Sequence, residues 1–402
     1  MDKRVEKYAS IGVIFLVVFG VLFFRRADAF THSQFWAEDF PIFLQQYEQL
    51  GFRSLTTVYG GYMHFVPRLI AILWGILHID YLYLPLCYNL SAFFVTFLVA
   101  VNLWYGAGYL GIKNKIPYAV LFVLLPLWPD IFMTITNVNF ITGLVLVNFL
   151  LVWHTGQGTK YYYLNLLLLL IISLNGPFST VLSPVVVVIF LRERKQMTLK
   201  KAVPLAIILF GGIVQGICIK FIDPDFYRGF PGPTEKYHLV KLITNNMNRL
   251  AFINKLADKS EPLSIILSLV VFGILLWLLI RSYKRITFKG KYIIPFTGLL
   301  FLAAFIKTYW PNESLILAME NARYYFIPYT CIGWVFIAGN DSKIKPWHLV
   351  AYVVFFFLQR EGTSFRLTDK HWKKQVREYY EGKRDTMEIN PDGWHFIMNK
   401  KK

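Results

Sequence analysis

The chain has 402 residues, of which 56% are hydrophobic and 18% aromatic but only 16% are charged. Soluble globular proteins carry about 25% charged residues, so this composition excludes an ordinary soluble domain and indicates a helical protein with several membrane crossings. The net charge of +18 would suit a nucleic-acid partner, but the basic residues stand in short clusters between apolar runs. Such clusters are typical of loops on the cytoplasmic face of a membrane, and no nucleic-acid partner is predicted.

The first apolar run covers residues 9–24. It has some features of a signal peptide, including Ala27-Asp28-Ala29 as a cleavage site, but Arg25 and Arg26 stand where a signal peptide is normally uncharged. We interpret the run as an uncleaved first span whose amino terminus is cytoplasmic. The loop that follows, residues 25–80, is then extracytoplasmic.

Residues 62–78 are also apolar, but Pro67 and Arg68 interrupt them. A membrane crossing at this place would put Lys113 and Lys115 outside, against the positive-inside rule. A helix that lies along the outer membrane surface fits the pattern better. Arg68 would then reach toward lipid headgroups or substrate.

The remaining apolar runs alternate with short basic loops. They predict spans at 81–106, at two places within 116–153, at two places within 161–191, and at 202–222, 262–280, 292–308, 324–339 and 347–359. The two double segments are broken by polar residues and proline near their middles, so each is interpreted as a hairpin of short helices. The total is about eleven spans, and every short basic loop then lies in the cytoplasm.

The predicted fold class is an all-α polytopic membrane protein with interfacial helices on its outer face. Residues 1–360 are expected to form one transmembrane domain, with 223–261 as a polar outer loop. The carboxy-terminal segment 361–402 is polar and rich in aromatic residues, as expected of a small packed unit at a membrane surface. Its net positive charge favours the cytoplasm, but that rule is weak for long terminal segments, and we place it outside. The three cysteines lie inside apolar runs and give neither a disulfide pattern nor a metal-ligand spacing.

This topology places the unusual residues together at the outer ends of the spans. They are the Glu38-Asp39 pair, Asp130, the turn with Asn137 and Asn139, Asn175-Gly176-Pro177, the loop 223–261 and Arg323. Helices that break near the outer leaflet can leave a cavity, because irregular backbone is tolerated at membrane depth where it lines water or is buried. A cavity open to both lipid and water suits a substrate that is half lipid and half sugar.

Four short motifs stand in this outer region or at its edges. They are Phe35-Trp36-Ala37-Glu38-Asp39 with Phe43, Gly61-Tyr62-Met63-His64-Phe65-Val66-Pro67-Arg68, Arg323-Tyr324-Tyr325-Phe326 and Pro391-Asp392-Gly393-Trp394. Together with the layout of most of the chain, they resemble bacterial membrane glycosyltransferases of the GT-C superfold. The resemblance implies an enzyme of the bacterial cell membrane with an extracytoplasmic active site. Such an enzyme moves a sugar from a polyprenyl-phosphate donor to a cell-envelope glycan or lipid acceptor.

The resemblance also implies roles for particular residues. An acidic residue of the first outer loop acts as the catalytic base in this superfold, and by position this is Asp39, with Glu38 as its rival. A basic residue near the outer boundary commonly holds the lipid phosphate, and Arg323 is the nearest match. Further candidates for substrate binding are His64, Arg68, Asn137, Asn139, Asn175 and Tyr324. The chain departs from the superfold in having no large soluble carboxy-terminal domain and no evident acceptor motif of the protein-modifying members.

The chemistry of transfer agrees with these assignments. The acceptor hydroxyl must lose a proton to a base as it attacks the anomeric carbon, and the leaving phosphate needs positive charge or hydrogen-bond donors. A carboxylate and an Arg across one cavity would supply both, because the guanidinium fork can bind two phosphate oxygens. Direct displacement with one base predicts inversion. No metal ligands or firm cofactor are predicted, and a divalent cation, Mg²⁺ or Mn²⁺, is left open.

Each candidate residue also has a structural interpretation. The acidic pair could cap a helix, and His64 could be a hydrogen-bonded interfacial residue. Arg68 and Arg323 could be anchors whose charged ends reach the membrane surface. The three asparagines could bind the backbone groups that broken helices leave without partners.

Other functions stay open from the sequence. A flippase or exporter of lipid-linked saccharide would carry ionisable residues deep within its spans, whereas the span interiors here are almost free of charge. A non-catalytic scaffold in an envelope-assembly complex has no sequence feature that separates it from the enzyme. A polysaccharide polymerase would use a lipid-diphosphate donor and is equally hard to separate from a transferase.

Overall fold

The computed structural model describes residues 3–125, 131–153, 162–222, 260–286, 293–309, 323–358 and 366–398. Two features singled out in the sequence lie outside the described residues. They are Asp130 and nearly all of the outer loop 223–261.

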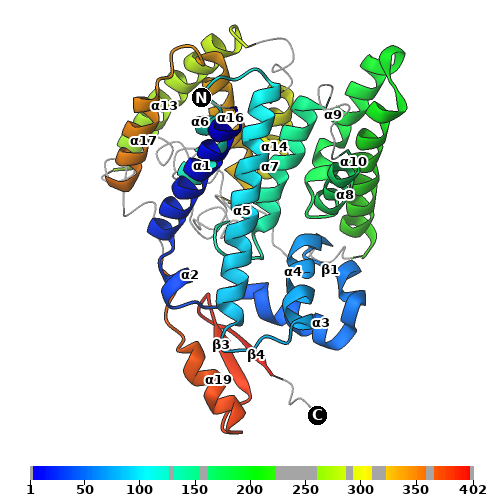
Figure 1. Cartoon of the computed structure of the whole chain (residues 1–402), viewed down its shortest axis with the longest axis vertical. Helices are drawn as coiled ribbons and strands as arrows, with labels where there is room; N and C mark the ends of the chain where they lie inside the picture. Colours follow the sequence, from blue (N-terminus) through cyan, green and yellow to red (C-terminus); the bar gives the residue numbers. More distant parts are fainter. Residues whose placement is uncertain are drawn as a thin grey trace.

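A bundle of helices forms most of the described structure (Figure 1). Its members are α1 (Lys3–Arg25), α5 (Leu84–Tyr109), α6 (Lys115–Leu124), α7 (Val138–Val152), α8 (Tyr162–Ser173), α9 (Phe178–Glu193), α10 (Leu199–Ile217), α13 (Glu261–Tyr283), α14 (Ile293–Tyr309), α16 (Phe326–Gly339) and α17 (Pro346–Leu358). Two short turns extend this set, η5 (Arg194–Gln196) and η6 (Cys218–Ile222). Every segment predicted as a span contains one of the bundle helices.

Length separates these helices into two groups. Within the described residues, 4 helical stretches are long and apolar enough to cross a membrane, namely Arg4–Arg25, Leu84–Tyr109, Leu199–Ile222 and Pro262–Tyr283. The shorter apolar helices, such as α6 with 10 residues, cover less than the ~30 Å of a bilayer core at a rise of about 1.5 Å per residue. A helical membrane protein is therefore supported, while about eleven crossings stays a prediction.

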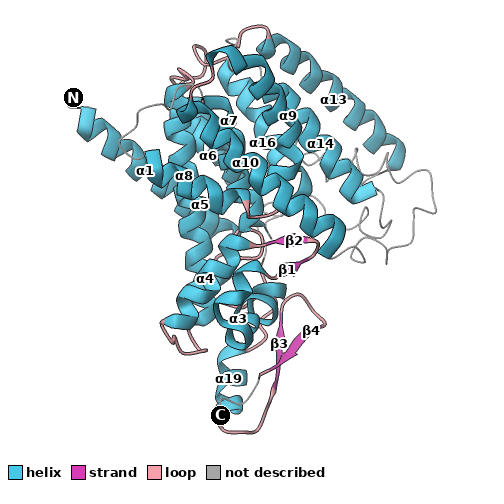
Figure 2. Ribbon diagram, turned by 90° about the vertical axis from the view of Figure 1, so that its right-hand side faces the viewer, coloured by secondary structure: helices cyan, strands magenta, loops and turns pink. Residues whose placement is uncertain are grey.

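The first loop and the carboxy-terminal segment lie at the same end of the bundle (Figures 1 and 2). The first loop contains α2 (Asp28–Thr31), η1 (Ala37–Asp39), η2 (Phe40–Leu44), α3 (Gln45–Leu50), η3 (Gly51–Thr56), β1 (Val58–Tyr59), β2 (Tyr62–Met63) and α4 (Phe65–Ile76). The carboxy-terminal segment contains α19 (Trp372–Tyr380), β3 (Thr386–Ile389) and β4 (Trp394–Ile397). α4 has 12 residues, the same length as α8 in the bundle, so its predicted position along the outer membrane surface stays a prediction.

Two antiparallel strand pairs add to the predicted all-α fold. β1 pairs with β2, with Val58 opposite Met63, and β3 pairs with β4, with Thr386 opposite Ile397. Both pairs are short, and strands of this length have too few residues for a period-two pattern to stand out in the sequence.

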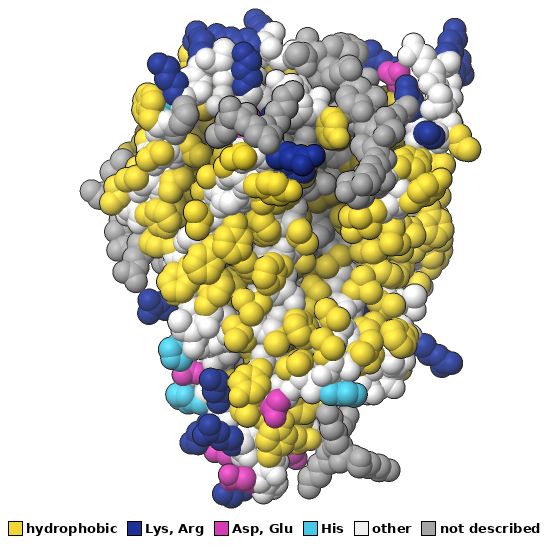
Figure 3. Space-filling view, in the orientation of Figure 1, with side chains coloured by type: hydrophobic (Ala, Val, Ile, Leu, Met, Phe, Trp, Pro, Cys, Tyr) yellow, Lys and Arg dark blue, Asp and Glu magenta, His cyan; other side chains and the backbone are white. Residues whose placement is uncertain are grey.

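The surface is divided along the long axis of the molecule (Figure 3). Hydrophobic side chains form a broad band across the middle of the face shown, as expected of helices that face lipid. Lys and Arg side chains gather at the end opposite the first loop, and a mixture of acidic, basic and histidine side chains covers the end that carries it. The side of the membrane that each end faces stays a prediction.

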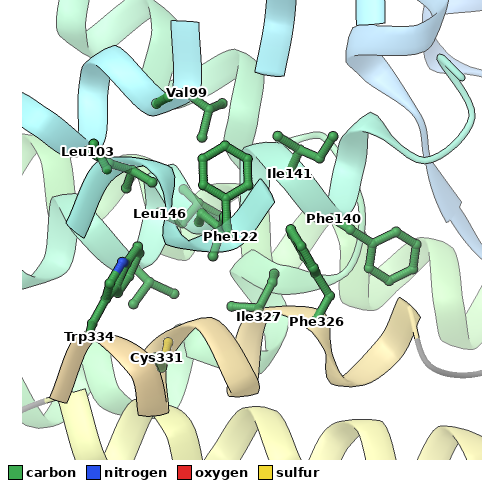
Figure 4. Close-up of a cluster of buried hydrophobic side chains, with 14 of the residues drawn as sticks. Val99, Leu103, Phe122, Phe140, Ile141, Leu146, Phe326, Ile327, Cys331 and Trp334 are labelled. Atoms are coloured by element: carbon green, nitrogen blue, oxygen red, sulfur yellow. The ribbon is translucent and has the colours of Figure 1, made fainter. Parts of the chain in front are cut away.

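The bundle core lies where α5, α6, α7 and α16 meet (Figure 4). Phe122 and Phe326 form an edge-on ring contact with centroids 6.2 Å apart. Trp334 stacks on Tyr118, and its Nε1 donates to the Tyr118 carbonyl at 2.9 Å. Cys331 is fully buried in the same cluster. This core fixes α16, and therefore also the residues that immediately precede it.

Close packing of α10 on α8 and α9 depends on two glycines. A Cβ atom at Gly211 would lie 2.7 Å from the Ser173 carbonyl oxygen, and one at Gly212 would lie 2.9 Å from the Ser179 carbonyl oxygen. Backbone atoms cannot move aside as a flexible side chain can, so we expect Gly212→Ala to destabilise the protein by about 1–3 kcal/mol.

The measurement for Gly212→Ala is the midpoint of denaturant unfolding in detergent. Gly216→Ala is the matched control on the same helix, since its new Cβ would meet only Thr180 Cγ2 at an ordinary 3.8 Å. Equal midpoints for the two variants would contradict the close approach of α10.

Candidate active site

The acidic pair lies in η1, one 3-10 turn at the end of the bundle that carries the first loop. Ala37, which precedes the pair, has φ of +39°. A non-glycine residue in this left-handed region costs about 1–3 kcal/mol and persists only where surrounding contacts hold it. The backbone before Glu38 is therefore held in place by its neighbours.

Asp39 is fully buried, and its carboxylate is bound by the protein. Thr136 donates to Oδ1 from its backbone nitrogen at 3.0 Å and from its hydroxyl at 2.7 Å. The Trp36 backbone nitrogen donates to Oδ2 at 3.4 Å. Burial raises the pKa of Asp39 to about 7, and the neighbouring Glu38 charge adds to the rise, while the hydrogen bonds from Thr136 oppose it.

This pKa has a consequence for stability. Because the folded-state pKa of about 7 lies above the ordinary value of 3.8, the folded protein binds the Asp39 proton more tightly than the unfolded chain does. The contribution of Asp39 to the free energy of unfolding is therefore fully present at low pH and is lost as the pH rises from about 4 to about 7. We expect the thermal midpoint to fall across that window in the wild type, and to fall less in Asp39→Asn.

The control for that measurement is Asp385→Asn, which alters an exposed carboxyl. It should keep the wild-type slope of thermal midpoint against pH. A slope in Asp39→Asn as steep as that of the wild type would show that Asp39 is not the titrating group.

Glu38 differs from its neighbour because it is only half buried. The Tyr59 hydroxyl donates to Glu38 Oε1 at 3.3 Å. Burial raises the pKa of Glu38, while the positive charge of Arg323 and the hydroxyls of Tyr59 and Thr136 oppose the rise. Glu38 is thus a partly accessible carboxyl that lies within electrostatic reach of Arg323.

Arg323 and Tyr324 immediately precede α16 and are both half buried. The Arg323 guanidinium lies over the Tyr324 ring, 5.5 Å from its centroid. The Tyr324 ring makes an edge contact with Phe140 of α7. The fold therefore brings the predicted phosphate ligand within electrostatic range of Glu38, although the two residues are far apart in the sequence.

His64 and Arg68 form a second group beside the first. His64 Nε2 lies 3.1 Å from the Tyr59 carbonyl oxygen, and its ring contacts the rings of Tyr62 and Phe43. Burial lowers the pKa of His64 to about 3, with the Arg68 charge as a further cause, so the imidazole is neutral. Tyr59 joins the two groups, since its hydroxyl binds Glu38 and its carbonyl binds His64.

Arg68 does not reach the surface, in contrast to the predicted reach toward headgroups. Its side chain is 1% exposed. Nη1 donates to Gln46 Oε1 at 2.9 Å, and the guanidinium lies over the Phe43 ring. Within the described part of the chain, Nε and Nη2 of Arg68 have no hydrogen-bond partner. The physical reason for the difference is that Phe43 of η2 packs against the guanidinium and Gln46 of α3 accepts a hydrogen bond from it.

Among the described residues, Asn175 joins α4 to α7 through hydrogen bonds of its side chain. It forms an isolated antiparallel bridge with His64. Its Oδ1 accepts from the Val66 backbone nitrogen at 3.1 Å, and its Nδ2 donates to Thr142 Oγ1 at 2.9 Å. These bonds match the structural interpretation of this asparagine, and a contact with sugar stays a prediction.

The other two asparagines lie at the start of α7. Asn137 occupies the N-cap position, and Asn139 Oδ1 accepts from the Phe140 backbone nitrogen at 2.9 Å. Gly176, whose φ is +84°, lies against Asn139, since a Cβ there would be 3.2 Å from Asn139 Cβ. Both asparagines are buried, and their binding to substrate also stays a prediction.

Three residues of this region were not singled out from the sequence. Thr136 holds Asp39, Tyr59 joins Glu38 to His64, and Gln215 of α10 binds both backbone polar groups of Met63, at 2.9 and 3.2 Å. A polar Gln in a largely apolar span was an available signal, because such a side chain needs a partner at membrane depth.

An apolar cavity of about 760 Å³ lies among α6, α13, α14, α16 and α17. Leu121, Phe272, Phe301 and Tyr329 are among the residues that line it. The Tyr329 ring contacts Tyr325, which is close to Arg323 in sequence, with centroids 6.1 Å apart. Part of this cavity therefore lies near the start of α16.

Among the described residues, no group of three or more His, Cys, Asp or Glu side chains is placed to hold a metal ion. Comparison of the chain with protein-family models, with curated proteins and with solved structures gave no match.

Proposed function

We propose that the chain is a glycosyltransferase that moves a sugar from a polyprenyl-phosphate donor to a cell-envelope glycan or lipid acceptor. The observation that carries the proposal is the electrostatic interaction between two half-buried groups, the Glu38 carboxyl, whose pKa is raised by burial, and the Arg323 guanidinium, whose charge opposes that rise. A base and a phosphate ligand are the two groups that this transfer needs.

Glu38 is the better placed of the two carboxyls to act as the base. The resemblance put this role on Asp39, but Asp39 is fully buried and accepts three hydrogen bonds from Thr136 and Trp36. Glu38 keeps an exposed part, and a raised pKa makes its carboxylate a stronger base. Asp39 then serves to hold the turn in which Glu38 stands.

The proposed reaction is a direct displacement. Glu38 takes the proton of the acceptor hydroxyl, whose oxygen forms a bond to the anomeric carbon while the bond from that carbon to the phosphate oxygen breaks. The polyprenyl phosphate leaves with one more negative charge, which Arg323 stabilises through charge-assisted hydrogen bonds. The product has the inverted configuration at the anomeric carbon.

The apolar cavity supports a lipid-linked donor. Its lining offers little beyond hydrocarbon side chains, so the ligand that it suits is a hydrocarbon chain, whose burial is favourable by about 25 cal/mol per Å² of apolar surface. Its lining residue Tyr329 contacts Tyr325, which lies two residues after Arg323 in the sequence. A donor whose phosphate binds Arg323 could therefore place its hydrocarbon chain there.

The proposed setting is a bacterial cell membrane crossed about eleven times, with the amino terminus in the cytoplasm. The first loop and the carboxy-terminal segment would both face the extracytoplasmic side. On the face that Figure 3 shows, Lys and Arg side chains gather at the opposite end of the bundle with few acidic side chains among them, which supports this orientation. Labelling of a cysteine at position 53 from the cytoplasmic side alone would contradict it.

The test of the function is a transfer assay with purified full-length protein in proteoliposomes. The donors are a panel of polyprenyl-phosphate sugars, and the readout is release of polyprenyl phosphate together with glycosylated acceptor. Turnover only with lipid-diphosphate donors would favour a polymerase. Movement of lipid-linked saccharide between leaflets without turnover would favour a flippase.

A further inference from the structure

The chain on the amino-terminal side of the acidic pair binds the turn between β3 and β4. Trp36 and Asn390 form an isolated parallel bridge. The Asn390 backbone nitrogen donates to the Phe35 carbonyl at 3.3 Å, and the Ala37 backbone nitrogen donates to the Asn390 carbonyl at 2.5 Å. Residues from the two ends of the sequence therefore share backbone hydrogen bonds immediately before Glu38.

The position of this bridge matters because Ala37 is the residue with φ of +39°. Its backbone conformation is unfavourable without support, and its N–H is the group that Asn390 accepts from. Asn390 is itself fixed, since it is 2% exposed and its Nδ2 donates to the Thr368 carbonyl at 2.9 Å. The direction in which Glu38 leaves the backbone therefore depends on a residue of the carboxy-terminal segment.

Aromatic packing holds the same two parts of the chain together. Phe396 of β4 stacks on Phe40, with ring centroids 4.2 Å apart. Trp372 of α19 meets Phe35 edge-on at 5.0 Å, and its Nε1 donates to the Tyr81 carbonyl at 2.8 Å. Phe35 and Phe40 flank the acidic pair in the sequence. The residues before and after the pair therefore both contact the carboxy-terminal segment.

Polar contacts enclose η1 in the same way. Gln34 Nε2 donates to Asp369 Oδ1 at 3.1 Å on the amino-terminal side, and Gln45 Nε2 donates to the Ile397 carbonyl at 2.9 Å on the carboxy-terminal side. These bonds resist rotation of the first loop against the carboxy-terminal segment.

We propose that residues 366–398 form a clamp that positions Glu38, with Asn390 as the positioning residue that acts through the Ala37 backbone. No side chain of the clamp takes part in the transfer reaction. The clamp instead fixes the position of the Glu38 carboxyl, which is the proposed base. The importance of Glu38 itself rests on the proposed function, but its positioning by the clamp is measurable without any substrate.

The test uses hydrogen exchange of the purified full-length protein in detergent, read by mass spectrometry on peptides that cover residues 35–44. Asn390→Ala removes the bond to Thr368 and should speed exchange of the amides of residues 37–40 about tenfold, which corresponds to about 1.4 kcal/mol. Phe396→Leu removes the stacked ring and should speed exchange at the same amides. His395→Ala, on an exposed residue of β4, is the matched control and should leave exchange unchanged.

Three outcomes decide the proposal. Faster exchange confined to the first loop, with a kcat for transfer that falls while the KM for donor stays constant, supports the clamp. Unchanged exchange in both Asn390→Ala and Phe396→Leu overturns it, and so does faster exchange that extends equally to α5, which would mean a general loss of stability. A wild-type protein without transferase activity would refute the proposed function, and the exchange data would still decide the positioning.

Discussion

Glu38→Gln is expected to lower the kcat of sugar transfer by about 10²–10⁴-fold, the range typical of a lost general base. Glutamine keeps the size of the side chain and can still accept a hydrogen bond from the Tyr59 hydroxyl, but it cannot take a proton. The KM for the donor should change by less than about threefold, because the lost interaction acts in the transition state. The measurement is steady-state release of polyprenyl phosphate against donor concentration.

The informative comparison is Asp39→Asn in the same assay. Its Oδ1 can still accept both bonds from Thr136, so the turn should persist, and we expect a loss of less than about tenfold in kcat. If Asp39→Asn were as inactive as Glu38→Gln while keeping a wild-type thermal midpoint, the roles of the two carboxyls would be reversed. Full activity in Glu38→Gln would remove Glu38 as the base.

The pH dependence of kcat is a second test of Glu38 as the base. Burial raises the pKa of Glu38 above its ordinary value of 4.5, and a base works only when it is ionised. The acidic limb of the profile should therefore lie above pH 4.5 in the wild type, with transfer lost as the pH falls through it.

The sequence predicted the helices well because their signal is local. Long apolar runs between basic loops are the direct consequence of a bilayer that excludes charge and of loops that stay in water. Each predicted span contains a helix, and so does the run at 62–78, whose position along the outer membrane surface stays a prediction. The number of crossings could not be settled in the same way, since several helices are shorter than a bilayer is thick.

The candidate site was predictable only in part, because its contacts are long-range. Glu38 and Arg323 each stand out locally as a charge beside an apolar run, whereas Thr136 looks like any hydroxyl in a turn and is revealed only by its bonds to Asp39. The burial of Arg68 depends on how η2 folds over it, which no local pattern indicates. The aromatic residues of the carboxy-terminal segment predicted a packed unit, but their partners Phe35 and Phe40 come from the other end of the chain.

Arg323→Gln is expected to raise the KM for the polyprenyl-phosphate donor by about 10–100-fold, as for the loss of charge-assisted hydrogen bonds worth about 1.5–3 kcal/mol. The leaving phosphate gains charge as its bond to sugar breaks, so kcat should fall as well. Arg323→Lys should recover only part of the loss, because an ammonium is a point charge without the two-pronged guanidinium geometry. Arg53→Gln, on an exposed residue of η3, is the matched control and should behave as the wild type.

The pH profile of Arg323→Gln separates a catalytic Arg323 from a membrane anchor. The positive charge of Arg323 lowers the pKa of Glu38, so its removal should raise that pKa and move the acidic limb of kcat to higher pH. Arg323→Lys keeps the charge and should keep the limb near its wild-type place, even where its KM is raised. An anchor that only holds α16 at the membrane surface would lower activity at every pH without moving the limb. If the acidic limb of the kcat profile in Arg323→Gln lay at the wild-type pH, the proposed electrostatic interaction between Arg323 and Glu38 would be contradicted.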